Sequence, residues 1–345
     1  MKRSQFALLG GFLLAVSSAR ATVPAQPSVP AQPGTINYIE GNASMGGQAL
    51  GQTSVGSATL AAGQSVSTRN GKVEILLTPG IFFRLGNNSS AEMVSPGLAD
   101  TVLTLQKGRA LVEVDQILPA NNVRINEGSA STQLKKVGLY DFDADRGQLR
   151  VFDGEAQVHV GDQQIKVKGG HELAFNATGK LKAQDFDKKA SEDDFYRWSS
   201  LRSSYISEAN VDTARLYVGA GGFYGPGWFG NGWYWDPYFS AYTFIPGDGV
   251  FFSPFGWGYY SPFFVYGAPY YGFGGYHRFW PGYRPRYSAG VSGLGFSGHA
   301  HSVGVGGSAF IGHGGGFQGG AFRGSSMGFH AAGGGGFRGG GGGHR

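Results

Sequence analysis

The residues best suited to contact a partner are tryptophans and arginines in the last third of the chain. They are Trp228, Trp233, Trp235, Trp257 and Trp280, with Arg278, Arg284 and Arg286. A guanidinium over an aromatic ring contributes about 0.5–1 kcal/mol at an exposed site, and a flat ring also offers an apolar face to a sugar. This set predicts a surface for weak association with a protein or a polysaccharide.

Histidine pairs are the next candidates, because imidazole nitrogens bind metals. His299 and His301 are two residues apart, but a zinc site requires three or four ligands at fixed geometry, and their glycine-rich surroundings supply none. The chain also lacks nucleophile-elbow, phosphate-loop and zinc-helix motifs. The sequence therefore predicts no metal, no cofactor and no catalytic residue.

Three acidic residues, Asp141, Asp143 and Asp145, alternate along one expected strand. A calcium loop of the EF-hand type needs a glycine and a glutamate at fixed positions after its acids, and Gly147 and Glu155 are misplaced for this. The favoured interpretation is a solvated strand edge that leads into a turn. The rival to a non-enzymatic protein is a hydrolase that uses Asp141, Asp143 or Glu155.

The N-terminus has the three parts of a secretory signal. Two basic residues precede an uncharged apolar run, Phe6–Val16, and Ala19–Ala21 fits a cleavage site. The run is shorter than the roughly 20 apolar residues that span a membrane, and no later stretch has that character. We expect residues 1–21 to be removed and the mature protein to be periplasmic or extracellular, with no transmembrane segment.

Charge and composition divide the chain near Val218. Neither lysine nor glutamate occurs after Glu208, and from Val218 onward the charged residues are six arginines and two aspartates. The formal net charge of +5 comes from the signal segment and this tail, so the body between them is slightly acidic. Basic residues crowd one face of a nucleic-acid-binding domain, and we expect no nucleic-acid partner. The absence of cysteine excludes disulfides and thiolate chemistry.

Residues 35–183 have the pattern of an all-β domain. Short runs of alternating apolar residues are separated by turn signals, which include Arg69–Gly71, Asp153–Gly154, Gly161–Asp162 and Gly169–Gly170. Residues 22–34 are rich in proline and are expected to form an extended spacer. A domain of about 150 residues can bury a core of its own.

Residues 184–217 change to a helical period. Five residues recur every three or four positions and would share one face: Phe195, Trp198, Leu201, Tyr205 and Ala209. The pattern predicts one helix from about Glu192 to Asn210, begun by a capping box of Ser191 and Asp194. We expect it to cover the β domain with Trp198 turned inward.

Two low-complexity regions follow. Residues 218–287 are dominated by tryptophan, tyrosine, proline and glycine, and partial order is expected there, whereas residues 288–345 are mostly glycine, alanine, serine, histidine and phenylalanine. Because so few aliphatic side chains cannot offset an ordering cost of about 1–2 kcal/mol per residue, 288–345 is predicted to be a largely disordered tail. We expect this tail to be adhesive, and removal of residues 218–345 to leave a soluble monomeric body.

The segment Gly56–Met93 resembles the FecR domain family, which opens on spaced glycines, leucines and a Val-x-Thr and continues through two strands around a glycine turn. The matching positions are Leu60, Gly63, Val66, Thr68, Gly71, Leu76, Gly80, Leu85 and Ser89. Later family elements resemble Leu105–Gly108 and Val151–Val158, so the likeness covers roughly residues 35–183.

This resemblance implies a β-solenoid or β-sandwich domain outside the inner membrane. In the best-studied members the domain relays a signal from an outer-membrane receptor to a sigma factor. The present chain departs from them, because a cleavable signal stands in place of the cytoplasmic segment and the membrane helix. The favoured interpretation is a non-enzymatic exported envelope protein that associates with itself, another envelope protein or a polysaccharide. The alternative is a periplasmic component of a FecR-type signalling system.

Overall fold

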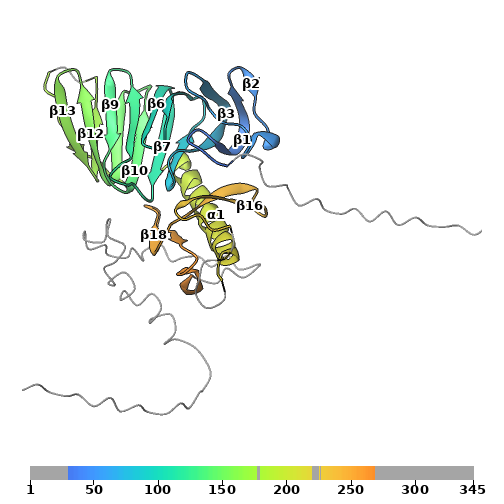
Figure 1. The fold of residues 1–345 in the computed structure, drawn as a ribbon. Coiled ribbons are helices and arrows are strands. Elements are labelled where there is room, and N and C mark those ends of the chain that lie inside the picture. Colours follow the sequence, from blue (N-terminus) through green and yellow to red (C-terminus); the bar gives the residue numbers. More distant parts are fainter. Residues whose placement is uncertain (1–29, 177–178, 220–224, 226, 269–345) are drawn as a thin grey trace, which may run out of the picture. The chain divides into compact units, whose positions relative to one another are not determined.

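The computed structural model describes residues 30–176, 179–219, 225 and 227–268, all within one compact unit, Met1–Val303. These residues are mostly β-strand with a single α-helix, and the strands do not close into a barrel (Figure 1). The predicted signal segment, most of the proline-rich spacer and the tail 288–345 lie outside the described residues. In the described part of the chain, no helix combines the length and apolar character needed to cross a bilayer.

Fifteen strands form one sheet. Their bounds are β1 Ile36–Met45, β2 Gln48–Ala49, β3 Ser65–Leu76, β4 Ile81–Leu85, β5 Ser90–Pro96, β6 Asp100–Lys107, β7 Arg109–Val114, β8 Asn122–Glu127, β9 Ala130–Leu134, β10 Gly138–Asp143, β11 Gln148–Asp153, β12 Glu155–Val160, β13 Gln163–Lys168, β14 His171–Ala174 and β15 Gln184–Asp185. A short 3₁₀ turn, η1, spans Gln52–Ser54.

The sheet has two arms that meet at β3. The order is β13-β12-β9-β8-β6-β5-β3-β4-β7-β10-β11-β14-β15, and β1 pairs with β2 and β3. The N-terminal part of β3 pairs with β5, which begins the first arm, and its C-terminal part pairs with β4, which begins the second. The chain crosses repeatedly between the arms, and every pairing is antiparallel except that of β6 with β8.

The turn predicted at Arg69–Gly71 is wrong, because these residues lie inside β3. Gly71 instead allows a close approach to β1, whose register with β3 shifts between Gly41 and Ala43. A Cβ atom at Gly71 would lie 2.5 Å from the backbone nitrogen of Asn42. Here glycine marks a bulged strand pair, which a sequence pattern does not separate from a turn.

Apolar side chains from both arms share one core. On β4 the residues Ile81, Phe83 and Leu85 belong to it, and on β7 every second residue from Ala110 does the same. These strands are also buried on their other face, where Phe82, Arg84 and Glu113 lie. A strand buried on both faces needs a second layer, and residues after the sheet provide it.

That second layer begins with the helix α1, Asp194–Leu216. The predicted capping box is wrong, because Asp193 is the N-cap and its Oδ1 accepts hydrogen bonds from the backbone nitrogens of Phe195 and Tyr196. Ser191 instead donates its hydroxyl to the carbonyl of Asp187.

The predicted buried face of α1 is confirmed only in part, since Phe195 and Ala209 are buried but the other three residues are not. Leu201 is 51% exposed and Tyr205 is 38% exposed, and Trp198 is only half-buried. The other buried residues of α1 are largely polar and include Ser199, Arg202, Ser203, Ser207, Asn210 and Thr213. Arg202 and Ser203 bond to buried carboxylates of the sheet, whereas Ser207, Asn210 and Thr213 bond to the residues that follow the helix. Hydrophobic periodicity does not reveal this face, because its partners are polar groups.

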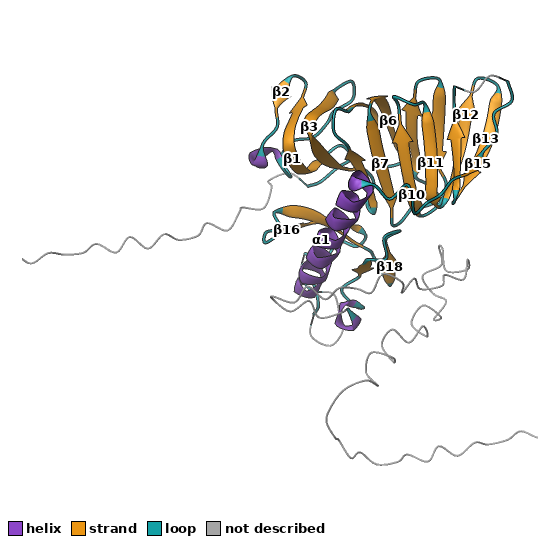
Figure 2. Ribbon diagram, turned by 180° about the vertical axis from the view of Figure 1, so that it is seen from behind, coloured by secondary structure: helices purple, strands orange, loops and turns teal. Residues whose placement is uncertain are grey.

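Two hairpins complete the layer. β16, Gly232–Asp236, pairs with β17, Ala241–Ile245, and β18, Val250–Phe252, pairs with β19, Gly258–Tyr260. A 3₁₀ turn, η3, spans Val265–Gly267. The helix contacts β16, β17, β19 and η3, and β16 lies beside α1 in the view from behind (Figure 2). We call residues 194–216 and 227–268 the cap.

Candidate functional site

A cluster of charged side chains lies between the sheet and the cap. Arg84 of β4 is at its centre, donating from Nε to Glu74 Oε2 at 2.8 Å and from Nη1 to Glu113 Oε2. All three side chains have no exposed surface. They occupy facing positions on adjacent strands, since Glu74 is opposite Arg84 in the β3–β4 register and Glu113 is opposite Phe82 in the β4–β7 register.

The cap and Asn37 of β1 supply the remaining partners of the two glutamates, and Asn37 Nδ2 donates to Glu74 Oε1 at 3.0 Å. Arg202 Nη2 donates to Glu74 Oε1 at 3.0 Å, and Ser203 Oγ donates to Glu113 Oε1 at 2.6 Å. Burial by itself would raise the pKa of Glu74, but Arg202 and Arg84 outweigh it and hold that pKa below its usual value. Two guanidinium groups thus pair with two carboxylates where the sheet meets the cap, and of these only Arg202 belongs to the cap.

Asp115 is the one carboxyl near this cluster that lacks such a partner. It is 1% exposed, and neither of its oxygens has a hydrogen-bond partner among the described residues. Burial, and then the neighbouring Glu113, raise the pKa of Asp115 well above its usual range. Burial and the neighbouring carboxylate thus both disfavour the charged form of Asp115.

Buried amide groups in the same region connect the cap to the sheet and the helix of the cap to its hairpins. Asn37 on β1 donates from Nδ2 to the carbonyl of Tyr242 at 3.0 Å and accepts from the Tyr242 nitrogen at 2.7 Å. On the helix, Asn210 donates to the carbonyls of Phe244 and Tyr260 at 2.9 and 3.0 Å and accepts from the Tyr260 nitrogen at 2.8 Å. Because these groups are enclosed, the cluster can fix the position of the cap, and it offers no reacting group to a substrate.

The three alternating acids are not a solvated edge, and that interpretation is wrong for two of them. Asp141 is 1% exposed and Asp143 is 5% exposed. Asp141 accepts a hydrogen bond from Arg109 at 2.9 Å and lies 3.6 Å from Arg150, while Asp143 caps the following turn through the nitrogen of Arg146. The cap and the neighbouring strands enclose this end of β10, so its acids are paired instead of hydrated. Asp145 is exposed and accepts from the nitrogen of Gly108.

The described tryptophans make their main contacts within the protein. Trp233 is 6% exposed, meets Phe82 at a centroid distance of 5.0 Å and donates to the Leu77 carbonyl at 3.3 Å. Trp228, Trp235 and Trp257 are half-buried, and the ring of Trp228 stacks on Tyr234 at 5.2 Å. Trp233 is thus closed to a partner.

The other predicted binding residues, Trp280, Arg278, Arg284 and Arg286, lie outside the described residues, as do His299 and His301. Of the histidines that are described, His171 lies 3.2 Å from Asp185 Oδ1, and His159 is exposed on β12. Within the described ranges no group of three or more potential ligands could hold a metal ion.

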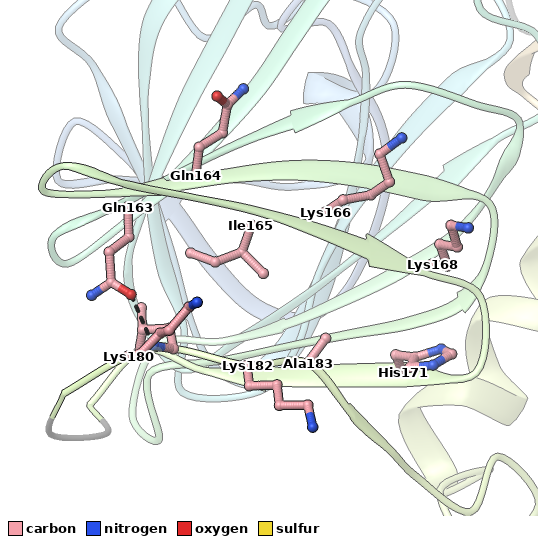
Figure 3. Close-up of a pocket in the computed structure, with 10 residues that line it drawn as sticks. Gln163, Gln164, Ile165, Lys166, Lys168, His171, Lys180, Lys182 and Ala183 are labelled. Atoms are coloured by element: carbon pink, nitrogen blue, oxygen red, sulfur yellow. Dashed lines mark hydrogen bonds between the residues drawn. The ribbon is translucent and has the colours of Figure 1, made fainter.

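An open groove lies at the free edge of the sheet, between β13 and the segment 180–183. Its volume is about 510 Å³, and its floor includes Ile165, Leu181 and Ala183. Four lysines line it, Lys166 and Lys168 from β13 and Lys180 and Lys182 from the facing segment (Figure 3). We call these residues the lysine groove.

The groove has a fixed shape, because Gln163 joins its two sides. Its Nε2 donates to the carbonyl of Gly179 at 3.1 Å, and its Oε1 accepts from the nitrogen of Leu181 at 2.8 Å. The Leu181 side chain is 6% exposed and belongs to the core between the arms. The sequence patterns discussed above did not predict this groove. The signal that could have found it is two pairs of lysines at strand spacing, one before β14 and one after it.

Comparisons with known proteins do not assign a family. No family model matches the sequence, and no curated protein matches it. The solved structures that are similar include two crystal structures of a proposed anti-sigma factor from Parabacteroides distasonis, with TM-scores of 0.32 and 0.31 and identities of 10% and 12%. Each alignment covers 36% of this chain and 61% of the other, so the chain spans about three-fifths of their length. A likeness this distant carries no argument about function.

Proposed function

We propose that this chain is a non-enzymatic scaffold of the cell envelope, with a FecR-like body of the sandwich or solenoid type, a folded aromatic cap and an adhesive tail. The observation that carries the proposal is the bonding of cap to body. Buried hydrogen bonds join Asn37 to Tyr242, Trp233 to the Leu77 carbonyl and Arg202 to Glu74. Such bonds hold the cap against the sheet, so the residues that follow Ala268 are attached to a rigid domain.

The proposed roles of the folded part and the tail follow from the composition before and after Ala268. The body and cap supply rigidity, whereas the 58 residues of 288–345 are mostly glycine and other small residues, with spaced phenylalanines and arginines. A glycine-rich coil of this length spans roughly 40 Å root-mean-square. A tail attached to the rigid domain can therefore reach a neighbouring molecule or a polymer, where several weak contacts act together.

Deletion of residues 269–345 tests this role. The full mature chain is expected to self-associate in sedimentation velocity or to pellet with envelope polysaccharide, whereas the chain ending at Ala268 stays monomeric and unbound. Both chains should unfold at the same urea concentration, since the deletion removes no residue of the cap. Equal association by both chains would place the interface on the body and contradict the proposal.

Cell fractionation separates this role from the signalling alternative. The scaffold is expected in the periplasm or outside the cell, without residues 1–21. A species anchored in the inner membrane that retains those residues would favour a component of a signalling system instead.

A further inference from the structure

We propose that the lysine groove binds a linear acidic polysaccharide, a polymer that repeats carboxylate or similar anionic groups among its hydroxyls. This site is separate from the tail, and its lysines lie on β13 and on the facing segment. The proposal goes beyond a scaffold that adheres through its tail, because it gives the body a ligand of its own.

The lysines form two rows with a regular spacing. Lys166 and Lys168 are two residues apart on β13, and Lys180 and Lys182 are two residues apart on the other side of the groove. For the pair on β13, two residues of extended strand span about 6.6 Å. Rows of this kind match a ligand whose charges repeat along a chain better than they match one compact anion.

Most of this positive charge is not neutralised by the protein. Glu155 is shared by Lys136 and Lys166, at 3.2 and 3.3 Å, and Asp185 pairs with His171. In the described part of the chain, Lys168, Lys180 and Lys182 have no acidic group within ion-pair distance. The groove thus has a surplus of three ammonium groups that an anionic ligand would offset.

The remaining lining favours a sugar polymer over other polyanions. The exposed amide of Gln164 can donate to and accept from hydroxyl groups, and the floor is formed by the small apolar surfaces of Ile165 and Leu181. Among the described residues that line the groove there is no Phe, Tyr or Trp, and the one ring, His171, lies 3.2 Å from Asp185 Oδ1. Single-stranded nucleic acids are bound largely by stacking of bases on aromatic side chains, so this groove lacks their main contact.

Lysines on an edge strand also have a protective role, because they discourage pairing with another chain. That role accounts for Lys166 and Lys168, since β13 is the last strand of its arm. It does not account for Lys180 and Lys182, which lie outside the strands. Their position depends on the Gln163 hydrogen bonds, which hold this segment against β13.

The test uses the full mature chain, with polygalacturonate as the probe and neutral dextran as its uncharged counterpart. The variant Lys180→Gln/Lys182→Gln removes two groove charges. The control Arg69→Gln/Lys107→Gln removes two charges from exposed positions on β3 and β6, away from the groove. Because all four side chains are exposed, both variants should retain the thermal unfolding midpoint of the parent.

Removal of the two groove lysines is expected to weaken polygalacturonate binding about tenfold at low salt, the order expected for two exposed ion pairs. The control should bind as the parent does, and the parent should lose affinity as salt rises. Dextran should not bind. Hydrogen exchange should show that polygalacturonate protects residues 163–168 and 179–183.

Three results would overturn the proposal. Equal weakening by the groove variant and the control would mean that binding follows net charge alone. Protection confined to residues outside 163–168 and 179–183 would place the site elsewhere. Tighter binding of single-stranded DNA or polyglutamate than of polygalacturonate would identify another class of polymer. None of these depends on the tail, because the same comparison can be made with the chain ending at Ala268.

Discussion

The two faces of β4 are both buried, but by different chemistry. Towards the core, Ile81, Phe83 and Leu85 pack among apolar residues of the opposite arm. Towards the cap, Phe82 packs against Trp233 and Tyr259, whereas Arg84 is held by Glu74 and Glu113. The inner face can be filled by many apolar combinations of similar volume, but the outer face accepts only a layer that supplies the missing charges and hydrogen bonds. The cap meets that condition.

The largest effect is expected for Arg84→Ala. This change leaves Glu74 and Glu113 buried without their shared partner, and breaking a buried pair in this way costs about 3–5 kcal/mol. Urea unfolding would measure the loss of free energy of unfolding, with Lys107→Ala as the exposed control, expected to lie within about 0.5 kcal/mol of the parent. A small loss at Arg84 would mean that water reaches the cluster and that the two faces do not differ as described.

Asn210→Ala tests the hydrogen bonds that join α1 to both hairpins. Each polar group left unpaired in a buried site costs about 1–3 kcal/mol, and Asn210 bonds to two carbonyls and one backbone nitrogen. We expect a loss of roughly 2–3 kcal/mol. The matched control is Asn176→Ala, which removes an exposed amide that donates a hydrogen bond to the Arg146 carbonyl. An equal loss for both variants would show that the hydrogen bonds of Asn210 do not stabilise the contact between the helix and the hairpins.

Trp198→Ala measures the rim of the joint between body and cap. The indole nitrogen donates to Glu40 at 2.7 Å, and the ring meets Phe195 and Tyr38 at centroid distances of 6.0 and 6.2 Å. Full burial of such a ring would imply a loss of about 3–5 kcal/mol, but the ring is half-buried. We therefore expect Trp198→Ala to lower the free energy of unfolding, measured in urea, by about 2 kcal/mol, which is less than a fully buried ring would give. A loss as large as that of Arg84→Ala would move the centre of the joint to this end of the helix.

A further effect depends on pH and concerns the carboxyl of Glu127 on β8. Burial raises the pKa of Glu127 to about 8, and the nearby charges of Asp143 and Asp141 add to this effect. The hydrogen bond from the Gln148 nitrogen acts in the opposite direction and lowers this pKa. Between the ordinary glutamate pKa and about 8, the folded state keeps a proton that the unfolded state has released. Stability contributed by this group is therefore present at acid pH and lost as pH rises, by at most about 1.4 kcal/mol per pH unit.

Glu127→Gln removes this titration while leaving an oxygen to accept from Gln148. The free energy of unfolding should then fall less steeply between pH 5 and about 8 than in the parent. Asp162→Asn, at the exposed turn between β12 and β13, is the control and should leave the slope unchanged. An unchanged slope in the Glu127 variant would show that another group dominates this pH range.

The sequence predicted the apolar core face of the sheet better than the face that contacts the cap. Alternation around Glu113 reveals the inward Val112 and Val114, and so indicates the strands and their core. It does not reveal that Glu113 itself is buried, because a charged residue between apolar ones usually faces water. The helix α1 shows the same difference. Leu201 and Tyr205 suggest an apolar face turned inward, but Arg202 and Ser203 are the residues buried there.

The missing information is long-range. Glu74, Arg84, Glu113 and Arg202 are far apart in sequence, and their pairing becomes visible only when β3, β4, β7 and α1 are placed together. The lysine groove depends in the same way on a side chain, Gln163, that joins two segments. The aromatic residues up to Ala268 read as low complexity, yet Trp233, Tyr242 and Tyr259 are buried.

The central claim is that residues 227–268 of the cap stabilise the sheet. The most direct test compares urea unfolding of two mature chains, one ending at Ala268 and one ending at Tyr217. The sequence alone suggested that the shorter chain would be a soluble monomer, but it would expose Leu76 and Phe82, each fully buried in the longer one. Since burial of one such side chain contributes about 1.5–3 kcal/mol, the shorter chain should lose roughly 3–6 kcal/mol of unfolding free energy. Two chains that unfold within about 0.5 kcal/mol of each other would contradict the account.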